Sequence, residues 1–287
     1  MPGSTRVFGM TSILRSASGV VGVALTGAFT LLAVLAHVVA PTDPFASVGS
    51  SLTPPSRAHT FGTDDLGRDV FSGIVHGTRT SLTVMLAVVA IASILGVGVG
   101  AVAGYRGGGV DDLLMRGTEA VQIVPRFFLA VIVIALFGPG LDRVVLVLGL
   151  TSWPAIARVV RAETLSLVRR EFVDAAHALG ATTWRIVFRH VLPNALPTAL
   201  VVISLNAASV ILLEAGLGFI GLGDPRSISL GYLANNAQRF MRIAWWMTLF
   251  PGAAIALAVL GLNLVGDALS DLADPRRRRS GLPRPGA

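Results

Sequence analysis

The sequence predicts an all-α, polytopic membrane protein with six transmembrane helices. Of its 287 residues, 53% are hydrophobic and only 14% are charged, and the mean hydropathy is +0.73. A soluble domain of this length carries more charge between its elements. Several apolar runs approach the roughly 20 residues that a helix needs to cross about 30 Å of hydrocarbon. The short alternating segments of a β-barrel do not occur in the sequence, so helices are expected to make the spans.

Six apolar stretches mark the expected spans in order. The first, 19–40, is too long for the apolar region of a signal peptide, and no A-x-A cleavage site follows it, so it is expected to remain as a span. The second, 81–104, carries Gly96, Gly100 and Gly104 on one helix face, which favours close packing against a neighbouring helix. The other four stretches are 120–137, 144–157, 198–222 and 245–269.

Arginine supplies all 23 basic residues, and its distribution predicts the orientation. Most arginines lie in the N-terminal tail 1–18, between the second and third spans, in the loop 158–197 and in the tail 272–287. Those on the opposite side are Arg57, Arg68, Arg79, Arg143, Arg226, Arg239 and Arg242. Because an excess of arginine marks the cytoplasmic side, both termini and the loop 158–197 are predicted to be cytoplasmic, and the loop 41–80 extracytoplasmic. The basic tail 272–287 is predicted to be disordered.

Composition excludes several activities. Without lysine the chain has no Walker A phosphate loop and no Schiff-base chemistry, and without cysteine it has no disulfide, thiolate metal site or thiol nucleophile. The five histidines lack ligand spacing such as H-E-x-x-H, so no metal or cofactor site is predicted. The net charge of +7 is spread between and beyond the spans, which argues against nucleic-acid binding. The chain is therefore not expected to be an enzyme.

The loop 158–197 contains a short helix, predicted over 171–179. Gly180 follows it and suits the left-handed conformation that often ends a helix. Asp174 near its start complements the helix dipole. Small side chains would let the backbone of a docked protein approach this helix closely, and they belong to Ala175, Ala176 and Ala178.

A second helix in the loop is expected to begin at Thr182 or Thr183, either of which is a suitable N-cap. Pro193 is expected to end it. Its apolar stripe consists of Trp184, Val187, Phe188 and Val191. Two short helices attached to the fifth span would transmit force from a docked protein to the bundle. The alternative is an interfacial helix pair that rests on lipid headgroups through its arginines.

Three blocks of sequence carry a family resemblance. The first reads FGTDDLGRD at 61–69 and is followed by Gly77, Arg79 and Ser81-Leu82. The second is Asp174-Ala175-Ala176, then Gly180 and Leu192-Pro193, with His190 before them. The third reads EAGLGFIGLG at 214–223. The second block is similar to the EAA loop of ABC importer permeases, although Asp174 replaces the usual Glu and His190 stands where many members have Ile. Together the blocks, over about 61–271, resemble the C-type permease of the dipeptide/oligopeptide (peptide/nickel) family.

The resemblance implies a fold, partners and a location. The fold is the transmembrane fold of type I ABC importers, with 81–271 as the core permease domain, in a bacterial cytoplasmic membrane. The chain would form half of a pathway for di- or oligopeptides beside a homologous B-type permease. Two partner ATPase subunits would bind ATP and Mg²⁺, and an extracytoplasmic binding protein would deliver the substrate.

The resemblance also implies where the ATPases act. In that family the EAA loop forms a helix that fits a cleft in the ATPase subunit. The corresponding positions in this sequence are Glu171, Asp174, Ala175, Ala176, Leu179, Gly180, Leu192 and Pro193.

Polar residues inside or beside the spans are further candidates. Those expected to line the pathway, to contact the partner permease or to hydrogen-bond between helices are Ser204, Asn206, Ser209, Glu214 and Asn263. For Glu214, a structural role as a cap for the glycine-rich backbone that follows is favoured. An outer cluster is expected to form an internal Arg–carboxylate network or to contact the binding protein, and it consists of Asp64, Asp65, Arg68 and Asp69.

Two alternatives to peptide import remain from the sequence. An ion-gradient-driven transporter or channel would usually carry ionisable groups at midspan or broken helices at matched positions in two halves, and only Glu214 approaches this. An importer of the same family could instead carry nickel, haem or another non-peptide cargo.

Overall fold

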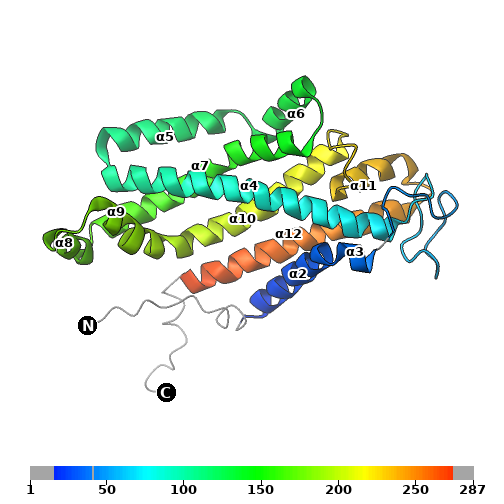
Figure 1. Ribbon diagram of the computed structural model, residues 1–287, viewed down its shortest axis with the longest axis horizontal. Coiled ribbons are helices and arrows are strands. Elements are labelled where there is room, and N and C mark those ends of the chain that lie inside the picture. The colour runs from blue at the N-terminus through cyan, green and yellow to red at the C-terminus, as the bar shows by residue number, and fades with distance from the viewer. Residues whose placement is uncertain (1–15, 41, 274–287) are drawn as a thin grey trace, which may run out of the picture.

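A computed structural model describes residues 16–40 and 42–273, and these ranges fold into helices without a regular strand. The long helices are α2 (Ala17–Val34), α4 (Val70–Arg106), α7 (Leu141–Val168), α10 (Leu192–Phe219) and α12 (Trp245–Ala273). Of these, α4, α7, α10 and α12 run side by side along the longest axis of the molecule (Figure 1).

Six spans can be assigned within the described residues. Five helices are long and apolar enough to cross a membrane, if α10 is counted together with the helical turns before it. The bent pair α5 (Gly108–Ile123) and α6 (Arg126–Phe137) makes the sixth. The prediction of an all-α protein with six spans is confirmed. The predictions for the tails 1–18 and 272–287 fall almost entirely outside the described residues.

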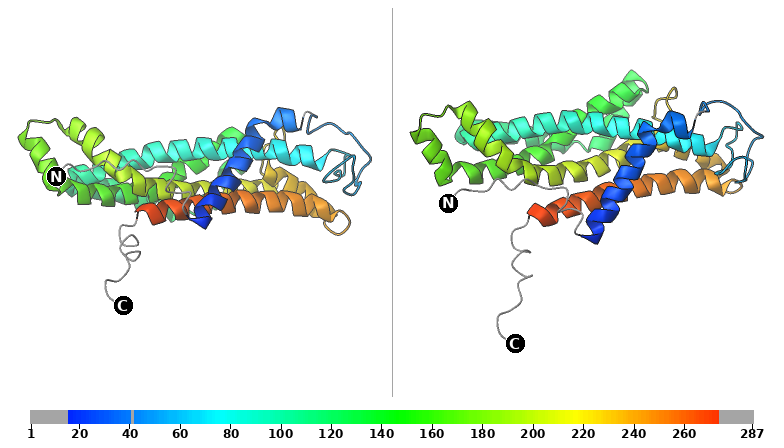
Figure 2. Two further views of the ribbon diagram at one scale, coloured as in Figure 1. Left: turned by 90° about the horizontal axis from the view of Figure 1, so that it is seen from below. Right: turned by 60° about the horizontal axis from the view of Figure 1, so that its bottom comes forward.

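Short elements occupy the two ends of the bundle (Figures 1 and 2). The α8 end, residues 169–191, contains α8 (Glu171–Ala178), α9 (Thr183–Ile186) and a π-helical segment η1 (Val187–Val191). The α11 end, residues 42–69 and 220–250, contains the long loop, α11 (Leu230–Ala237), the 3₁₀ segment η2 (Gln238–Phe240) and the first turn of α12. The short α3 (Ala36–Val39) lies beside it, and α2 lies obliquely across α4 and α12 (Figure 2).

Glycines bring α4 and α7 into close contact along a seam. A Cβ atom added at Gly96 would lie 2.6 Å from Ile156 Cβ, and one added at Gly100 would lie 2.5 Å from the carbonyl oxygen of Ala157. Gly104 is equally close to α7. A larger residue would push the two backbones apart, so the predicted packing role of these glycines is confirmed.

The second span begins earlier than predicted. α4 starts at Val70 rather than at residue 81, because the carboxylate of Asp69 caps it by accepting hydrogen bonds from the backbone N–H and the hydroxyl of Ser72, both at 2.8 Å. The polar residues 76–80 interrupt the apolar pattern, and this interruption led the prediction to start the helix after them.

The fourth span is longer than predicted. The sequence predicts its end at residue 157, with Arg158 and Arg161 in the following loop, but α7 continues to Val168. Arg161 donates from Nε and Nη2 to the carboxylate of Asp111 on α5, at 2.5 and 2.6 Å. Because this ion pair satisfies Arg161 against a neighbouring helix, the arginine does not mark a loop. The predicted cytoplasmic loop is correspondingly shorter.

The third span is broken, which the sequence did not predict. α5 and α6 meet at an angle of 69°, across Val124 and Pro125. Val124 is extended, with φ −90° and ψ 124°. A following proline imposes this conformation because its ring disfavours the helical region for the residue before it. The predicted span 120–137 therefore corresponds to the last residues of α5, the break and α6.

Pro193 does not end a helix as predicted. Through η1 the chain passes from α9 directly into α10, and the N–H of Leu192 bonds the carbonyl of Val187 five residues earlier. Pro193 then falls in the first turn of α10, and because the helix is continuous through η1, its missing N–H removes one hydrogen bond from the ladder beside the π-helical turn.

The predicted apolar stripe of the second short helix is not buried as a unit. Thr182 caps α9 as expected, but Ile186 and Val191 are the buried residues, whereas Trp184 and Phe188 are 71% and 60% exposed. The two exposed rings stack with centroids 5.5 Å apart. The prediction assumed a regular 3.6-residue period, which the π-helical turn interrupts.

Candidate coupling helix and translocation cavity

α8 projects from one end of the bundle, directly after α7 (Figure 1). Its C-terminus closes at Gly180, whose φ is +74°. The N–H of Gly180 bonds the carbonyl of His177 at 2.9 Å, and the N–H of Ala181 bonds the carbonyl of Ala176 at 3.0 Å. This pair of bonds is the Schellman motif, so the left-handed glycine predicted from the sequence is confirmed.

Few contacts anchor α8 to the bundle: the buried Val173, and His177, whose Nε2 lies 3.3 Å from Tyr105 Oη of α4. Val173 is buried with Ile186 and Leu167, and Ala176 packs partly against them. The other residues of α8 are exposed, Ala175 among them, and so is Leu179 in the turn after the helix, with an exposed fraction of 88%. The outward face of α8 is therefore small and accessible.

The structure gathers most of the predicted coupling residues on α8. Those that lie on this helix or its C-terminal turn are Glu171, Asp174, Ala175, Ala176, Leu179 and Gly180. Leu192 and Pro193 lie apart from them at the start of α10. Leu192 packs against a cluster formed by α4, α7 and α10, and Pro193 is exposed.

A cavity of about 250 Å³ lies where the third span is broken. Its lining comes from the break between α5 and α6 and from the middle of α7, and it consists of Gln122, Val124, Pro125, Arg126, Thr151, Ser152, Pro154, Ala155 and Arg158. Arg126 donates from Nη1 to Ser152 Oγ at 3.2 Å and to Asn206 Oδ1 at 3.5 Å. Asn206 in turn donates from Nδ2 to the carbonyl of Ser152 at 3.5 Å. Side chains from α6, α7 and α10 thus meet beside one polar cavity.

Of the polar residues proposed for the pathway, only Asn206 lies beside this cavity. Ser209 donates its hydroxyl hydrogen to the carbonyl of Leu205 within α10. Ser204 packs near Gly266 of α12, and Asn263 is a half-buried residue of α12. Ser204, Ser209 and Asn263 are not part of the cavity lining.

Glu214 ties three helices together. It is buried and accepts a hydrogen bond from Ser81 Oγ of α4 at 2.8 Å. Ser81 Oγ also accepts from the N–H of Leu230 at the start of α11, at 3.3 Å. The sequence predicts that Glu214 caps the glycine-rich backbone that follows it. The structure instead shows a side-chain hydrogen bond that joins α10 to α4, which is also a structural role.

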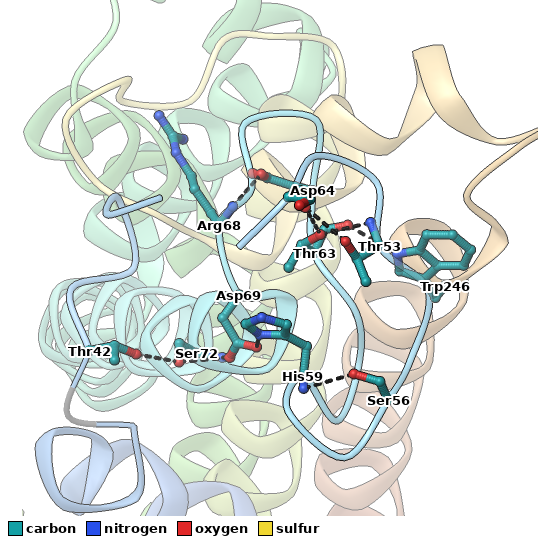
Figure 3. Close-up of polar contacts among 11 residues, drawn as sticks. Thr42, Thr53, Ser56, His59, Thr63, Asp64, Arg68, Asp69, Ser72 and Trp246 are labelled. Carbon is teal, nitrogen blue, oxygen red and sulfur yellow. Dashed lines mark hydrogen bonds and ion pairs between the residues drawn. The ribbon is translucent and has the colours of Figure 1, made fainter. Parts of the chain in front are cut away.

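Backbone hydrogen bonds, more than ion pairs, order the outer acidic cluster (Figure 3). Asp64 Oδ1 accepts from the N–H of Leu66 at 2.9 Å and from the N–H of Arg68 at 2.8 Å. Burial nevertheless raises the pKa of Asp64 above its usual value, because desolvation of the carboxylate outweighs these hydrogen bonds. Asp69 caps α4 and contacts His59 Nδ1 at 3.3 Å.

Arg68 does not form the expected network with these carboxylates. Its guanidinium lies over the ring of Phe45, 5.2 Å from the centroid, and donates to Tyr232 Oη at 3.3 Å. Asp65 accepts from Asn236 Nδ2 of α11 at 2.7 Å. The cluster therefore holds the loop 42–69 against α11.

Sequence reasoning missed Arg126 and Ser152. The available signal was a charged residue directly after a proline inside an apolar run, since an arginine at membrane depth usually has a function. Its partners could not be identified in advance because they come from two other helices.

The chain matches a known transport family. The family described as "Binding-protein-dependent transport system inner membrane component" matches residues 96–279. The dipeptide transport system permease protein of Alkalihalophilus pseudofirmus is 37% identical over 90% of this chain and 86% of that protein. The dipeptide transport system permease protein of Bacillus subtilis is 38% identical over 89% and 82%. The probable D,D-dipeptide transport system permease protein of Escherichia coli is 38% identical over 86% and 83%.

The fold is similar to that of a solved ABC transporter chain. A chain of the methionine ABC transporter in an inward-facing conformation is similar with a TM-score of 0.56 and 19% identity, over 70% of this chain and 95% of that chain. At this identity the likeness concerns the fold alone. The alternative of an ion-gradient-driven transporter or channel is not favoured, because the matching family and the named relatives are transport-system permease components. This chain belongs to the family of binding-protein-dependent transport system inner membrane components, the permease subunits of ABC importers.

Proposed function

We propose that this chain is the C-type permease subunit of a bacterial ABC importer for di- or oligopeptides. The names of its relatives support peptide as the cargo class. The excess of arginine on one side of the spans supports an orientation with both termini and α8 in the cytoplasm.

The chain supplies half of a translocation pathway and pairs with a homologous B-type permease. Two ATPase subunits bind ATP and Mg²⁺, and one of them seats on α8. An extracytoplasmic binding protein delivers the peptide. The permease performs no bond-breaking chemistry. It makes different contacts in its inward-open and outward-open states, so that a partner which favours one state shifts the population toward it.

The observation that carries this proposal is the form of α8. Only Val173 is deeply buried, and the outward face offers small side chains and an exposed leucine. A helix that rested on lipid headgroups would be rich in Lys or Arg on its polar face, whereas α8 has none and carries Glu171 and Asp174. Instead, the narrow face of α8 admits the surface of another protein, and the link of two residues to α7 would carry its motion into the bundle.

The test is transport coupling in proteoliposomes that contain all partner subunits. Ala175→Trp enlarges the exposed face of α8 without touching the packing of the chain itself. Gly180→Val strains the left-handed residue that closes α8. Both are expected to lower peptide uptake per ATP hydrolysed by about tenfold, which corresponds to a coupling free energy within the usual range.

Gly98→Val is the matched control, because this exposed glycine of α4 has no neighbouring atom within 4 Å of an added Cβ. It should transport like the wild type. Normal coupling in both α8 variants, or a purified wild type that retains no ATPase subunit, would contradict the proposal.

A further inference from the structure

Arg126 is a charged residue at membrane depth that lacks a carboxylate partner. The ion pairs of arginine found in the described residues are those of Arg143, Arg161 and Arg226. Arg126 instead contacts two neutral acceptors, Ser152 Oγ and Asn206 Oδ1, and both hydrogen bonds come from Nη1. Its Nε and Nη2 donors have no partner among the residues 16–40 and 42–273. An unpaired charge is costly in a membrane, so a position that keeps one calls for a ligand.

The cavity around Arg126 has an excess of positive charge. Arg158 also lines it, and no acidic residue is found in its lining. Arg126 is the first residue of α6, a helix of 12 residues whose N-terminus adds a partial positive charge at the same place. Two guanidinium groups and a helix N-terminus therefore converge on an open polar space.

The rim of this cavity is unsuited to lipid. Gln122 and Arg158 on the cavity rim are exposed, and Val124 and Pro125 leave backbone groups outside a regular helix. Irregular backbone and charged side chains are tolerated at membrane depth only where they are buried in protein or line a water-filled space. Apolar side chains of the same segment are exposed too, among them Ile123 at 79% and Phe128 at 62%, so the polar surface is confined to the cavity and its rim. The cavity, and not the whole face of α6 and α7, is the part suited to an aqueous path.

We propose that Arg126, assisted by Arg158, is a transit site for the C-terminal carboxylate of the peptide. This inference rests on the proposed function as a peptide importer. A carboxylate is planar and accepts two parallel hydrogen bonds from one guanidinium, and Arg126 has two donor positions free for it. Ser152 and Asn206 hold the third nitrogen and so fix the plane of the group. Every unmodified peptide carries this carboxylate whatever its side chains, so the site serves many cargoes.

The main test compares a peptide with its amide. Proteoliposomes with all partner subunits import radiolabelled trialanine or trialanine amide, each at a saturating concentration of binding protein. In Arg126→Gln the ratio of acid to amide uptake is expected to fall about tenfold, the usual effect of losing one charge-assisted pair. Arg143→Gln, a partly exposed arginine outside the cavity, should keep the wild-type ratio.

A second measurement separates charge from folding. The chain has no cysteine, so Arg126→Cys introduces a single thiol when the partner chains also lack cysteine. Reaction with 2-aminoethyl methanethiosulfonate places a positive charge there, and methyl methanethiosulfonate adds a neutral group of smaller size. Only the cationic reagent should restore trialanine uptake, and it does so in protein that has already folded and assembled.

The outcomes are distinct. If the wild-type complex imports neither peptide with ATP, the proposed function itself fails. If the wild type imports both and Arg126→Gln lowers acid and amide uptake equally, Arg126 pairs with a carboxylate of the partner permease instead, and the transit site is overturned. Equal rescue by the two thiol reagents would overturn it as well.

Discussion

The α11 end and the α8 end of this bundle are built in opposite ways. At the α11 end, Trp246 is 5% exposed and donates from Nε1 to the carbonyl of Thr63 at 3.1 Å, and Phe61 stacks on Phe250 with centroids 4.1 Å apart. At the α8 end, Trp184 is 71% exposed. These rings of the α11 end are satisfied within the chain, although the neighbouring Trp245 is 54% exposed, whereas the stacked rings of the α8 end remain open.

The difference indicates which end is complete without partners. Loop 42–69 is held against the bundle by hydrogen bonds, by ring contacts and by the cap on α4. α8 is held through the buried Val173, the partly packed Ala176 and the exposed contact of His177 with Tyr105, so it has few contacts with the bundle. Stability of the isolated chain should therefore depend on the α11 end, and energy coupling on the α8 end.

The same substitution at both ends gives the largest contrast. Trp246→Ala leaves a cavity in the buried cluster at the start of α12 and should lower the free energy of unfolding by about 3–5 kcal/mol. Trp184→Ala removes only a stacked, exposed ring and should cost less than about 1 kcal/mol. Thermal unfolding of each purified variant in detergent measures both. Equal losses would contradict the proposed difference between the ends.

Helix-terminal aspartates provide a second, smaller contrast. Asp69→Ala removes the N-cap of α4 and two hydrogen bonds to Ser72, so a loss of about 1–2 kcal/mol is expected. Asp174→Ala removes an exposed carboxylate from the first turn of α8, where only the helix dipole is affected, and should cost less than about 0.5 kcal/mol. The same unfolding assay applies, and a larger loss for Asp174→Ala would reverse the assignment.

The smallest expected effect is a pH dependence at the α11 end. Burial raises the pKa of Asp64 from its usual 3.8, so the folded protein holds this proton more tightly than the unfolded chain. The stability contributed by Asp64 is thus fully present below the usual pKa and is lost as the pH rises through the raised value.

Asp64→Asn should abolish this dependence, because the amide oxygen still accepts from the N–H groups of Leu66 and Arg68 but carries no charge. The difference in melting temperature between the wild type and Asp64→Asn, followed upward from about pH 4, isolates the contribution of this carboxyl group. A difference that stays constant with pH would show that Asp64 does not titrate differently on folding.

Features with local causes were predictable from the sequence. Glycines four residues apart identified the face of α4 that packs on α7, and Gly180 identified the end of α8. Thr182 was a correct N-cap. In each case the geometry depends on residues within one or two turns, so pattern and propensity suffice.

Features that depend on distant partners were not predictable. Arg161 suggested a loop, but Asp111 satisfies it from fifty residues earlier in the chain. The start of α4 was not predicted because the polar residues 76–80 follow it inside the helix. The break at Pro125 was not predicted because apolar residues on both sides of it read as one span. Arg126 was visible as a charge inside a span, yet its setting needed Ser152 and Asn206 from two other helices.

The continuity of α7 has a mechanical consequence. Ser152 lies 16 residues from the end of α7 at Val168, or about 24 Å along the axis. Pro154 lies between Ser152 and that end, and its ring removes one helical hydrogen bond and favours a bend at this point. A movement that begins at Val168 would therefore reach Ser152 and Arg126 only through this proline, which makes Pro154 the position where α7 can absorb a displacement or pass it on.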